Sequence, residues 1–334
     1  MTLASGVGSH PGEDQQAFDE AVKLVLGELP DLPYLPEVPG RGATATLTGR
    51  ALAVVAELAA DLQPAGWRLT GSGGTPGVDQ RRARSLLAQD LDGLEEQAQD
   101  HAGAFKVQVA GPWTLAATVE RPRGDKVLAD FGARRELAQA LAEGLTSHVA
   151  DVRRRLPGVG RLVVQVDEPA LPAVLAGSVP TASGFSRHRS VELPEASQAL
   201  GWVLDAVTEA GAEPWVHSCA RETPLDVLRG AGAAGLSVDH AQLSAHDLDE
   251  TASALEAGQT VALGVVPPTD RENRPTDGQV TEGVLRWLEM LGLDPEQVGE
   301  HLVLTPACGL AGATPAWARS MLEVVRKAAA QIGS

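Results

Sequence analysis

The sequence predicts an α/β fold, and a (β/α)8 barrel of the TIM type is the architecture that fits it best. Short apolar runs of β-type composition alternate along the chain with longer amphipathic stretches of helical period. Residues 162–166, for example, are apolar at nearly every position, which is typical of a parallel strand buried on both faces. The chain has 334 residues. One barrel domain over residues 1–334 is expected, since such barrels usually take about 250 residues. A doubly wound open sheet is the alternative.

Eight candidate strands support the barrel. They cover residues 3–9, 67–71, 106–111, 162–167, 213–219, 235–239, 260–266 and 302–308. Because crossovers between parallel strands are right-handed, the helices between them would cover the outside of the sheet. The carboxyl ends of all the strands would then share one rim of the barrel.

Helical patterns separate most of these strands. They cover residues 18–29, 47–62, 80–102, 131–156, 193–210, 223–230 and 314–332. Thr223 and Thr314 are each followed by proline, a pair typical of an N-cap and the first helical residue. We therefore expect these two threonines to begin helices.

Two segments of the chain do not follow the strand and helix pattern. Four prolines fall between residues 30 and 39, so this N-terminal extension cannot form a helix or a central strand. We expect it to run as extended chain over the surface. Residues 176–192 form a long loop after the fourth strand; a functional loop and a plain surface loop are both compatible with its length.

The composition excludes several classes of protein. The chain has 44 acidic and 27 basic residues and a net charge of −17, whereas a general nucleic-acid binder needs a basic face. No apolar run reaches the length of about 18 residues that a membrane span requires. The N-terminus lacks the features of a secretory signal, and two cysteines are too few for a disulfide framework. We expect a soluble, cytoplasmic protein without a nucleic-acid or membrane partner.

One histidine and the two cysteines form the strongest chemical signal. His217 and Cys219 are two positions apart at the end of the fifth candidate strand, so their side chains project to the same side. Cys308 ends the eighth candidate strand and would reach the same rim. One imidazole and two thiolates suit a tetrahedral Zn²⁺ site. The alternative is a pair of buried, inert cysteines beside a core histidine.

Carboxylates at other strand ends extend this candidate site. Asp239 ends the sixth candidate strand and is a candidate fourth zinc ligand, with a helix N-cap as the alternative. Asp167 and Glu168 follow the fourth strand, where carboxylates can bind a cationic group or cap a helix. Gly8 follows the first strand and permits close approach of the backbone.

Several short motifs resemble those of a known family. In chain order they are Gly8-Ser9-His10-Pro11, Gly111-Pro112-Trp113-Thr114, Val166-Asp167-Glu168-Pro169-Ala170-Leu171, His217-Ser218-Cys219, Leu263-Gly264-Val265-Val266 and Pro306-Ala307-Cys308-Gly309-Leu310. Together they resemble the catalytic C-terminal half of cobalamin-independent methionine synthase, over essentially the whole chain. The resemblance implies a (β/α)8 barrel that binds zinc, with the sulfur of homocysteine as a metal ligand.

The resemblance also implies roles for individual residues. His217, Cys219 and Cys308 match the zinc ligands, and Asp239 stands where the family has a glutamate ligand. Asp167 matches the acid that holds the amino group of homocysteine. Ser9, with the backbone near Gly8, matches the part of the family's site that holds the carboxylate of the amino acid.

The chain departs from the family at other positions. Residues 70–73 read Thr-Gly-Ser-Gly where a Gly-Glu pair is expected, so a second acid for the amino group is missing. The family has a tryptophan that stacks on folate, and its position falls near Thr118 here. An acid that helps to hold folate in the family is replaced by Ala173. Residues 267–269 read Pro-Pro-Thr where the proton-donor histidine is expected. The residues expected to bind homocysteine are therefore mostly present, whereas those expected to bind folate are replaced.

These matches and departures predict a zinc-dependent methyltransferase that moves a methyl group to the thiol of homocysteine and makes methionine. The predicted donor is not methyl-folate polyglutamate, and a methylated corrinoid protein is the candidate partner. Two alternatives remain open. One is a zinc-dependent methyltransferase with another small thiol as acceptor; the other is a non-catalytic zinc-binding barrel of the methionine pathway.

Overall fold

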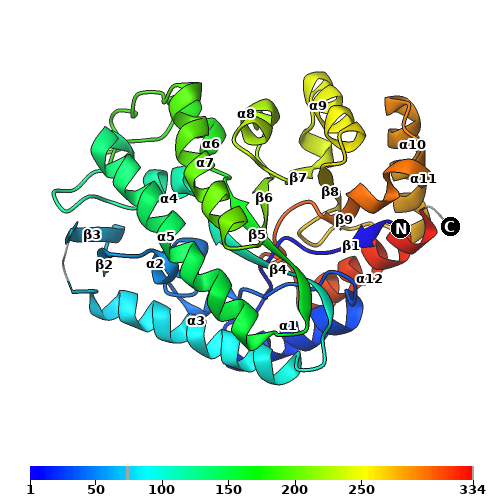
Figure 1. Cartoon of the computed structure of the whole chain (residues 1–334), viewed down its shortest axis with the longest axis horizontal. Helices are drawn as coiled ribbons and strands as arrows, with labels where there is room; N and C mark the ends of the chain where they lie inside the picture. Colours follow the sequence, from blue (N-terminus) through cyan, green and yellow to red (C-terminus); the bar gives the residue numbers. More distant parts are fainter. Residues whose placement is uncertain (73–74, 333–334) are drawn as a thin grey trace.

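A computed structural model describes residues 1–72 and 75–332, and its centre is one curled sheet of seven parallel strands (Figure 1). The strands lie in the order β1-β9-β8-β7-β6-β5-β4. They are β1 (Leu3–Ala4), β4 (Gly103–Ala110), β5 (Val159–Asp167), β6 (Glu213–Ser218), β7 (Gly235–Asp239), β8 (Thr260–Val266) and β9 (Leu302–Pro306). Consecutive strands from β4 to β9 are neighbours, as in a barrel, so the predicted α/β barrel class is confirmed.

The proline-rich extension closes the gap between the two edges of this sheet. Residues 34–37, here called the closing segment, form parallel bridges from Tyr34 to Lys106 of β4 and from Glu37 to Ser9 after β1. The backbone N–H of Leu35 donates to Lys106 O at 2.9 Å, and that of Glu37 donates to Gly8 O at 3.0 Å. The closing segment therefore occupies the position of the second barrel strand.

The prediction of an extended chain was right for this segment, but its place on the surface was wrong. Leu32, Tyr34 and Leu35 are buried. Proline lacks an N–H but keeps its carbonyl, and Pro33 O accepts a hydrogen bond from Lys106 N at 2.9 Å. An irregular, proline-rich chain can thus replace a strand where only a few hydrogen bonds are needed.

The second predicted strand lies outside the barrel. β3 (Gly66–Ser72) pairs in an antiparallel hairpin with β2 (Leu58–Gln63), to one side of the main sheet (Figure 1). The helix predicted over residues 47–62 accordingly ends early, as α2 (Leu47–Val54). The alanine-rich sequence of β2 resembles a helix locally, and pairing with β3 overrides that preference. Gly73, which ends the Thr-Gly-Ser-Gly stretch, and the next residue, Gly74, lie outside the described residues.

Helices cover the outside of the sheet (Figure 1). They are α1 (Gln15–Glu28), α2, α3 (Val78–Gln97), α4 (Pro112–Thr118), α5 (Phe131–Arg155), α6 (Leu171–Leu175), α7 (Leu193–Glu209), α8 (Leu225–Gly230), α9 (Ala245–Glu256), α10 (Asp277–Leu291), α11 (Pro295–Val298) and α12 (Pro315–Gln331). Thr314 caps α12 as predicted, whereas Thr223 does not cap α8 and instead donates to Ala220 O. No helix in the described ranges is long and apolar enough to cross a membrane.

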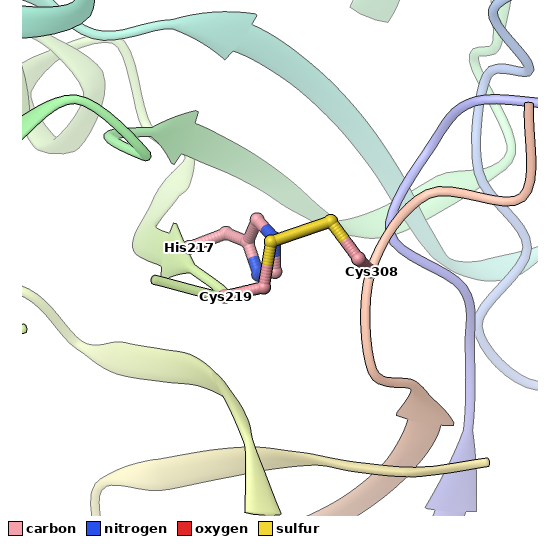
Figure 2. Close-up of side chains that lie close together, drawn as sticks. All are labelled: His217, Cys219 and Cys308. Atoms are coloured by element: carbon pink, nitrogen blue, oxygen red, sulfur yellow. A yellow bond between two sulfur atoms is a disulfide. The ribbon is translucent and has the colours of Figure 1, made fainter. Parts of the chain in front are cut away.

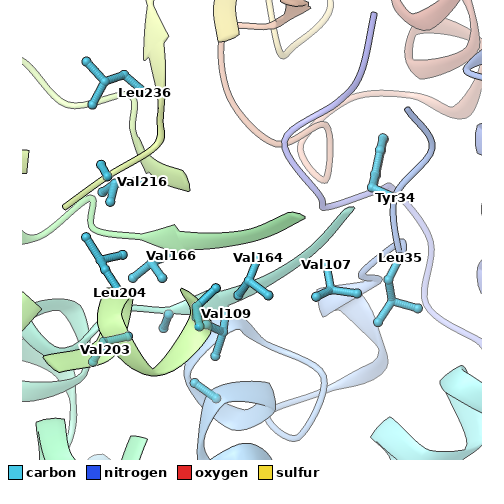
Figure 3. Packing of buried hydrophobic residues seen from close by; sticks show 14 of the residues in the cluster. Tyr34, Leu35, Val107, Val109, Val164, Val166, Val203, Leu204, Val216 and Leu236 are labelled. Atoms are coloured by element: carbon cyan, nitrogen blue, oxygen red, sulfur yellow. The ribbon is translucent and has the colours of Figure 1, made fainter. Parts of the chain in front are cut away.

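The alternation of side chains along β5 separates the core from the interior of the barrel. Val164 and Val166 point outward and pack with Val203 and Leu204 of α7 (Figure 3). Inside the barrel, Val163 belongs to a small apolar cluster that also holds Leu32, Trp215, Ala262 and Val303. The next inward residues of β5 are Gln165 and Asp167, so the interior changes from apolar to polar toward the carboxyl ends of the strands. The candidate site lies at this polar end.

Candidate active site

A cavity of about 190 Å³ lies at the carboxyl ends of the strands. Its lining includes Gly8, Ser9, Glu37, Gln108, Asp167, His217, Cys219, Cys308 and Gly309. The structure thus brings together the predicted site residues except Asp239 and Glu168. It adds Glu37 and Gln108, which the sequence analysis missed.

The side chains of His217, Cys219 and Cys308 lie close together (Figure 2), and all three line this cavity. One ligand atom from each residue lies within 4.8 Å of the others, and no other group of this kind occurs in the described part of the chain. His217 is on β6, Cys219 directly follows that strand, and Cys308 lies in the loop after β9. The expected projection of His217 and Cys219 to one side is therefore what the structure shows.

The His217 ring has one nitrogen hydrogen-bonded and the other without a partner. Nδ1 lies 3.1 Å from Ser237 O and 3.0 Å from Ser237 Oγ, so it can donate to the carbonyl. Burial, reinforced by the positive charge of Lys106, lowers the pKa of His217 to about 4 and keeps the ring neutral. Nε2 is buried and has no hydrogen-bond partner among the described residues. A metal-binding histidine typically donates its second N–H to a carbonyl in this way.

The two cysteine sulfurs lie next to each other and form a disulfide in the structure, with the Cα atoms 5.9 Å apart. A disulfide offers no thiolate, so this bond and a metal site are alternative states of the same two side chains. In the reduced state, two thiolates and the free Nε2 of His217 form a donor set that fits zinc.

Asp239 lies outside this group. Its Oδ1 accepts a hydrogen bond from Ala241 N at 2.9 Å and caps the short 3-10 helix His240–Gln242. Neither the cavity lining nor the His-Cys-Cys group includes it. The structure therefore favours the N-cap alternative over the predicted ligand role, because the chain turns into this helix directly after β7.

Asp167 and Glu168 have different environments although they are adjacent. Asp167 lines the cavity, is 6% exposed and accepts a hydrogen bond from Gln165 Nε2 at 2.7 Å. Burial and the nearby Glu37 carboxylate raise the pKa of Asp167 well above its usual range. An incoming cation would stabilise its ionised form.

Glu168 instead caps α4. Its Oε1 accepts from Trp113 N at 2.9 Å, and its Oε2 accepts from Thr114 N and Thr114 Oγ1, both at 2.7 Å. Burial raises the pKa of Glu168 to about 7, although these hydrogen bonds favour the ionised form. The capping alternative therefore holds for Glu168, and Asp167 alone faces the cavity.

We expect Glu168→Gln to destabilise the protein. Each carboxylate oxygen accepts a backbone N–H, so either orientation of the amide sets its NH2 group against a buried donor. An unsatisfied buried group of this kind costs about 1–3 kcal/mol in the free energy of unfolding. Urea unfolding at pH 7 would measure it, with the exposed Glu272→Gln as the control. An unchanged unfolding midpoint for Glu168→Gln would contradict the capping role.

Lys106 is a buried lysine behind the cavity wall. Its side chain points into the barrel from β4 and is 1% exposed, and Nζ donates to Val7 O at 2.9 Å. Burial lowers the pKa of Lys106 to about 8, while Asp167 and Glu37 oppose this shift. Lys106 was not predicted from the sequence; the available signal was a lysine inside an apolar strand, two positions before Gln108.

Ser9 joins the loop after β1 to the loop that carries Cys308. Ser9 O accepts from Leu310 N at 2.8 Å, and Ser9 Oγ accepts from Ala311 N at 3.4 Å. A Cβ atom at Gly309 would collide with Ser9 Oγ, so the serine hydroxyl can keep this position only because residue 309 is glycine. Ser9 and Gly8 therefore line the same cavity as His217, Cys219 and Cys308.

Comparison with known proteins decides the family. The profile described as "Cobalamin-independent synthase, Catalytic domain" matches residues 99–331. The chain belongs to this family. Its membership confirms the resemblance seen in the sequence and supports a methyltransferase that acts on homocysteine. No curated protein sequence matches the chain.

Solved structures agree with this membership of the cobalamin-independent synthase family at the level of the fold. A B12-independent methionine synthase from Shewanella sp. W3-18-1, in complex with selenomethionine, has a TM-score of 0.65 and 14% identity, and the match covers 99% of this chain and 97% of that one. A GH20 β-N-acetylhexosaminidase from Streptomyces coelicolor A3(2) has a TM-score of 0.50 and 11% identity, covering 98% and 64%. At these identities the likeness shows the fold alone.

Proposed function

We propose that this family member is a zinc-dependent methyltransferase that transfers a methyl group to the thiol of homocysteine and makes methionine. The supporting observation is the unpartnered Nε2 of His217 beside the sulfurs of Cys219 and Cys308. These three side chains line the same cavity as Asp167 and Ser9.

His217, Cys219 and Cys308 would hold the metal. Three protein ligands are typical of catalytic zinc sites, which keep one position open for substrate. A free thiol has a pKa near 8.5 and is mostly protonated at neutral pH, whereas a zinc-bound thiol is deprotonated and can act as the nucleophile. The hydrogen bond from His217 Nδ1 to Ser237 O orients the imidazole for this role.

Asp167 and the loop after β1 would position the amino-acid part of the substrate. The Asp167 carboxylate would bind the amino group, and Ser9 with the backbone at Gly8 would bind the carboxylate. Lys106 Nζ and Gln165 Nε2 both donate to Val7 O, at 2.9 and 3.0 Å, and so hold this loop in place. Fixing the substrate beside the metal contributes to the rate by positioning.

We propose a methylated corrinoid protein as the methyl donor in place of methyl-folate polyglutamate. The proposal rests on residues that the chain lacks for folate. Thr118, near the position of the stacking tryptophan, is a solvent-exposed threonine that donates to Thr114 O. Residues 267–269 offer no histidine as a proton donor.

A titration of the cobalt-substituted protein with homocysteine tests the proposal. The protein is reduced, stripped of metal and loaded with one equivalent of Co²⁺, which takes the same nitrogen and sulfur ligands. We expect a sulfur-to-cobalt charge-transfer band to grow and saturate as homocysteine is added. Methylcobalamin and methyl-tetrahydrofolate are then compared as donors in a methionine-forming assay of the zinc protein.

The outcomes separate the alternatives. A cobalt spectrum that ignores homocysteine but responds to another small thiol, such as coenzyme M, would favour a different acceptor. Thiolate bands that respond to no thiol would indicate a structural metal in a non-catalytic barrel. If the reduced protein binds no cobalt, the proposed metal site is wrong.

A further inference from the structure

Glu37 is a buried acid at the rim of the barrel. It ends the closing segment, and its backbone bonds Gly8 and His10 at the loop after β1, with Glu37 N donating to Gly8 O at 3.0 Å and Glu37 O accepting from His10 N at 2.7 Å. The closing segment occupies the second-strand position, so Glu37 lies where the carboxyl end of that strand would be. The second acid for the amino group is missing at residues 70–73, and Glu37 brings an acid to this rim from another part of the chain.

The two carboxylates are the charged groups of the cavity wall. Among the described residues that line the cavity, only Glu37 and Asp167 are acids, and no lysine or arginine is present. Glu37 is 4% exposed. The two acids are close enough for the charge on Glu37 to raise the pKa of Asp167. A cation placed beside both of them would relieve this repulsion.

The arginine that pairs with Glu37 is Arg50, which does not line the cavity and also pairs with a second acid. Arg50 Nε is 3.2 Å from Glu37 Oε1, but the contact lacks hydrogen-bond geometry, and Oε1 has no hydrogen-bond partner among the described residues. Arg50 also pairs with Asp90 at 2.5 Å. Arg50 therefore does not satisfy the Glu37 carboxylate by a hydrogen bond, and Glu37 lines the cavity, where it can also meet a cation.

We propose that Glu37 is the second carboxylate of an ammonium-binding subsite, which it forms with Asp167, and that it selects amino-acid thiols over thiols without an amino group. The inference rests on the proposed function and extends it to substrate choice. The ammonium group of homocysteine would bind between the two acids while its sulfur reaches the metal. Anionic thiols without an amino group would meet two carboxylates and be disfavoured.

The test compares homocysteine with 4-mercaptobutanoate, which has the same thiol and carboxylate but no amino group. Dissociation constants for both are measured from the charge-transfer band of the cobalt-substituted protein. We expect the wild type to prefer homocysteine, and Glu37→Gln to reduce that preference by about 10- to 100-fold, the range for a hydrogen bond to a charged group. The loss should come from weaker homocysteine binding, with 4-mercaptobutanoate binding unchanged or slightly tighter.

Two further variants separate recognition from a structural effect. Glu120 is also buried and paired with an arginine, Arg68, but does not line the cavity. Glu120→Gln should keep the wild-type preference. Glu37→Asp, which retains the charge on a shorter side chain, should lie between the wild type and Glu37→Gln. The ratio of the two dissociation constants does not depend on the folded fraction of a preparation.

The possible results are distinct. If the wild type binds homocysteine at the metal and Glu37→Gln keeps the same preference, the role of Glu37 is refuted while the proposed function stands. If homocysteine fails to reach cobalt in the wild type, the proposed function is wrong and the subsite falls with it. Equal losses in Glu37→Gln and Glu120→Gln would also overturn the inference, because they would indicate a general effect of removing a buried ion pair.

Discussion

Cys308→Ser should lose the metal and, with it, at least about 100-fold in methyl transfer, more than the loss of a residue that only supports a ligand. A serine hydroxyl is not deprotonated at neutral pH and does not replace a thiolate on zinc. Only His217 and Cys219 of the group would remain as ligands, which is too few to retain the ion. Zinc content after dialysis of the reduced protein against a chelator, together with a methionine-forming assay, measures both effects.

Asp239→Asn is the matched control for this prediction. Asp239 was a candidate ligand in the sequence, but in the structure it caps the helix His240–Gln242 and lies outside the His-Cys-Cys group. We expect Asp239→Asn to retain one zinc per chain. Full zinc content in Cys308→Ser would contradict the site, and zinc loss in Asp239→Asn would restore the fourth-ligand role.

Lys106→Met should lower the free energy of unfolding by about 1.5–3 kcal/mol, the range for a hydrogen bond made by a charged group. The change removes a positive charge that interacts with Asp167 and Glu37 inside the barrel, and it removes one of the two donors to Val7 O. Methionine fills a similar volume, so lost packing contributes little. Urea unfolding followed by far-UV circular dichroism measures the change.

Lys327→Met is the surface counterpart of that variant. Lys327 is half-exposed and pairs with Glu323 one helical turn earlier, at 2.6 Å. Such pairs contribute less than about 1 kcal/mol, so this variant should unfold close to the wild-type midpoint. A Lys106→Met protein as stable as the Lys327→Met protein would show that Lys106 is not needed to balance the buried acids.

Features that depend on local periodicity could be predicted from the sequence. The apolar runs gave the strands Gly235–Asp239 and Thr260–Val266 with the bounds seen in the structure. The spacing of His217 and Cys219 placed both side chains on one side of a strand end, since alternate residues of a strand share a face. The common rim of a parallel barrel was enough to bring Cys308 to them. Each of these inferences needs only the alternation of side chains along one strand and the class of the fold.

How the barrel closes, and which polar residues face its cavity, depend on tertiary contacts. The hairpin of β2 and β3 stands outside the sheet, and the closing segment takes the second-strand position and delivers Glu37 to the site. The division of roles between Asp167 and Glu168 likewise depends on which of two adjacent side chains meets the N-terminus of α4. These outcomes depend on contacts between residues far apart in the chain, such as Glu37 with Ser9 and Lys106 with Val7. Local sequence patterns carry no information about such pairings, because a pattern shows which face a residue takes but not which distant segment packs against it.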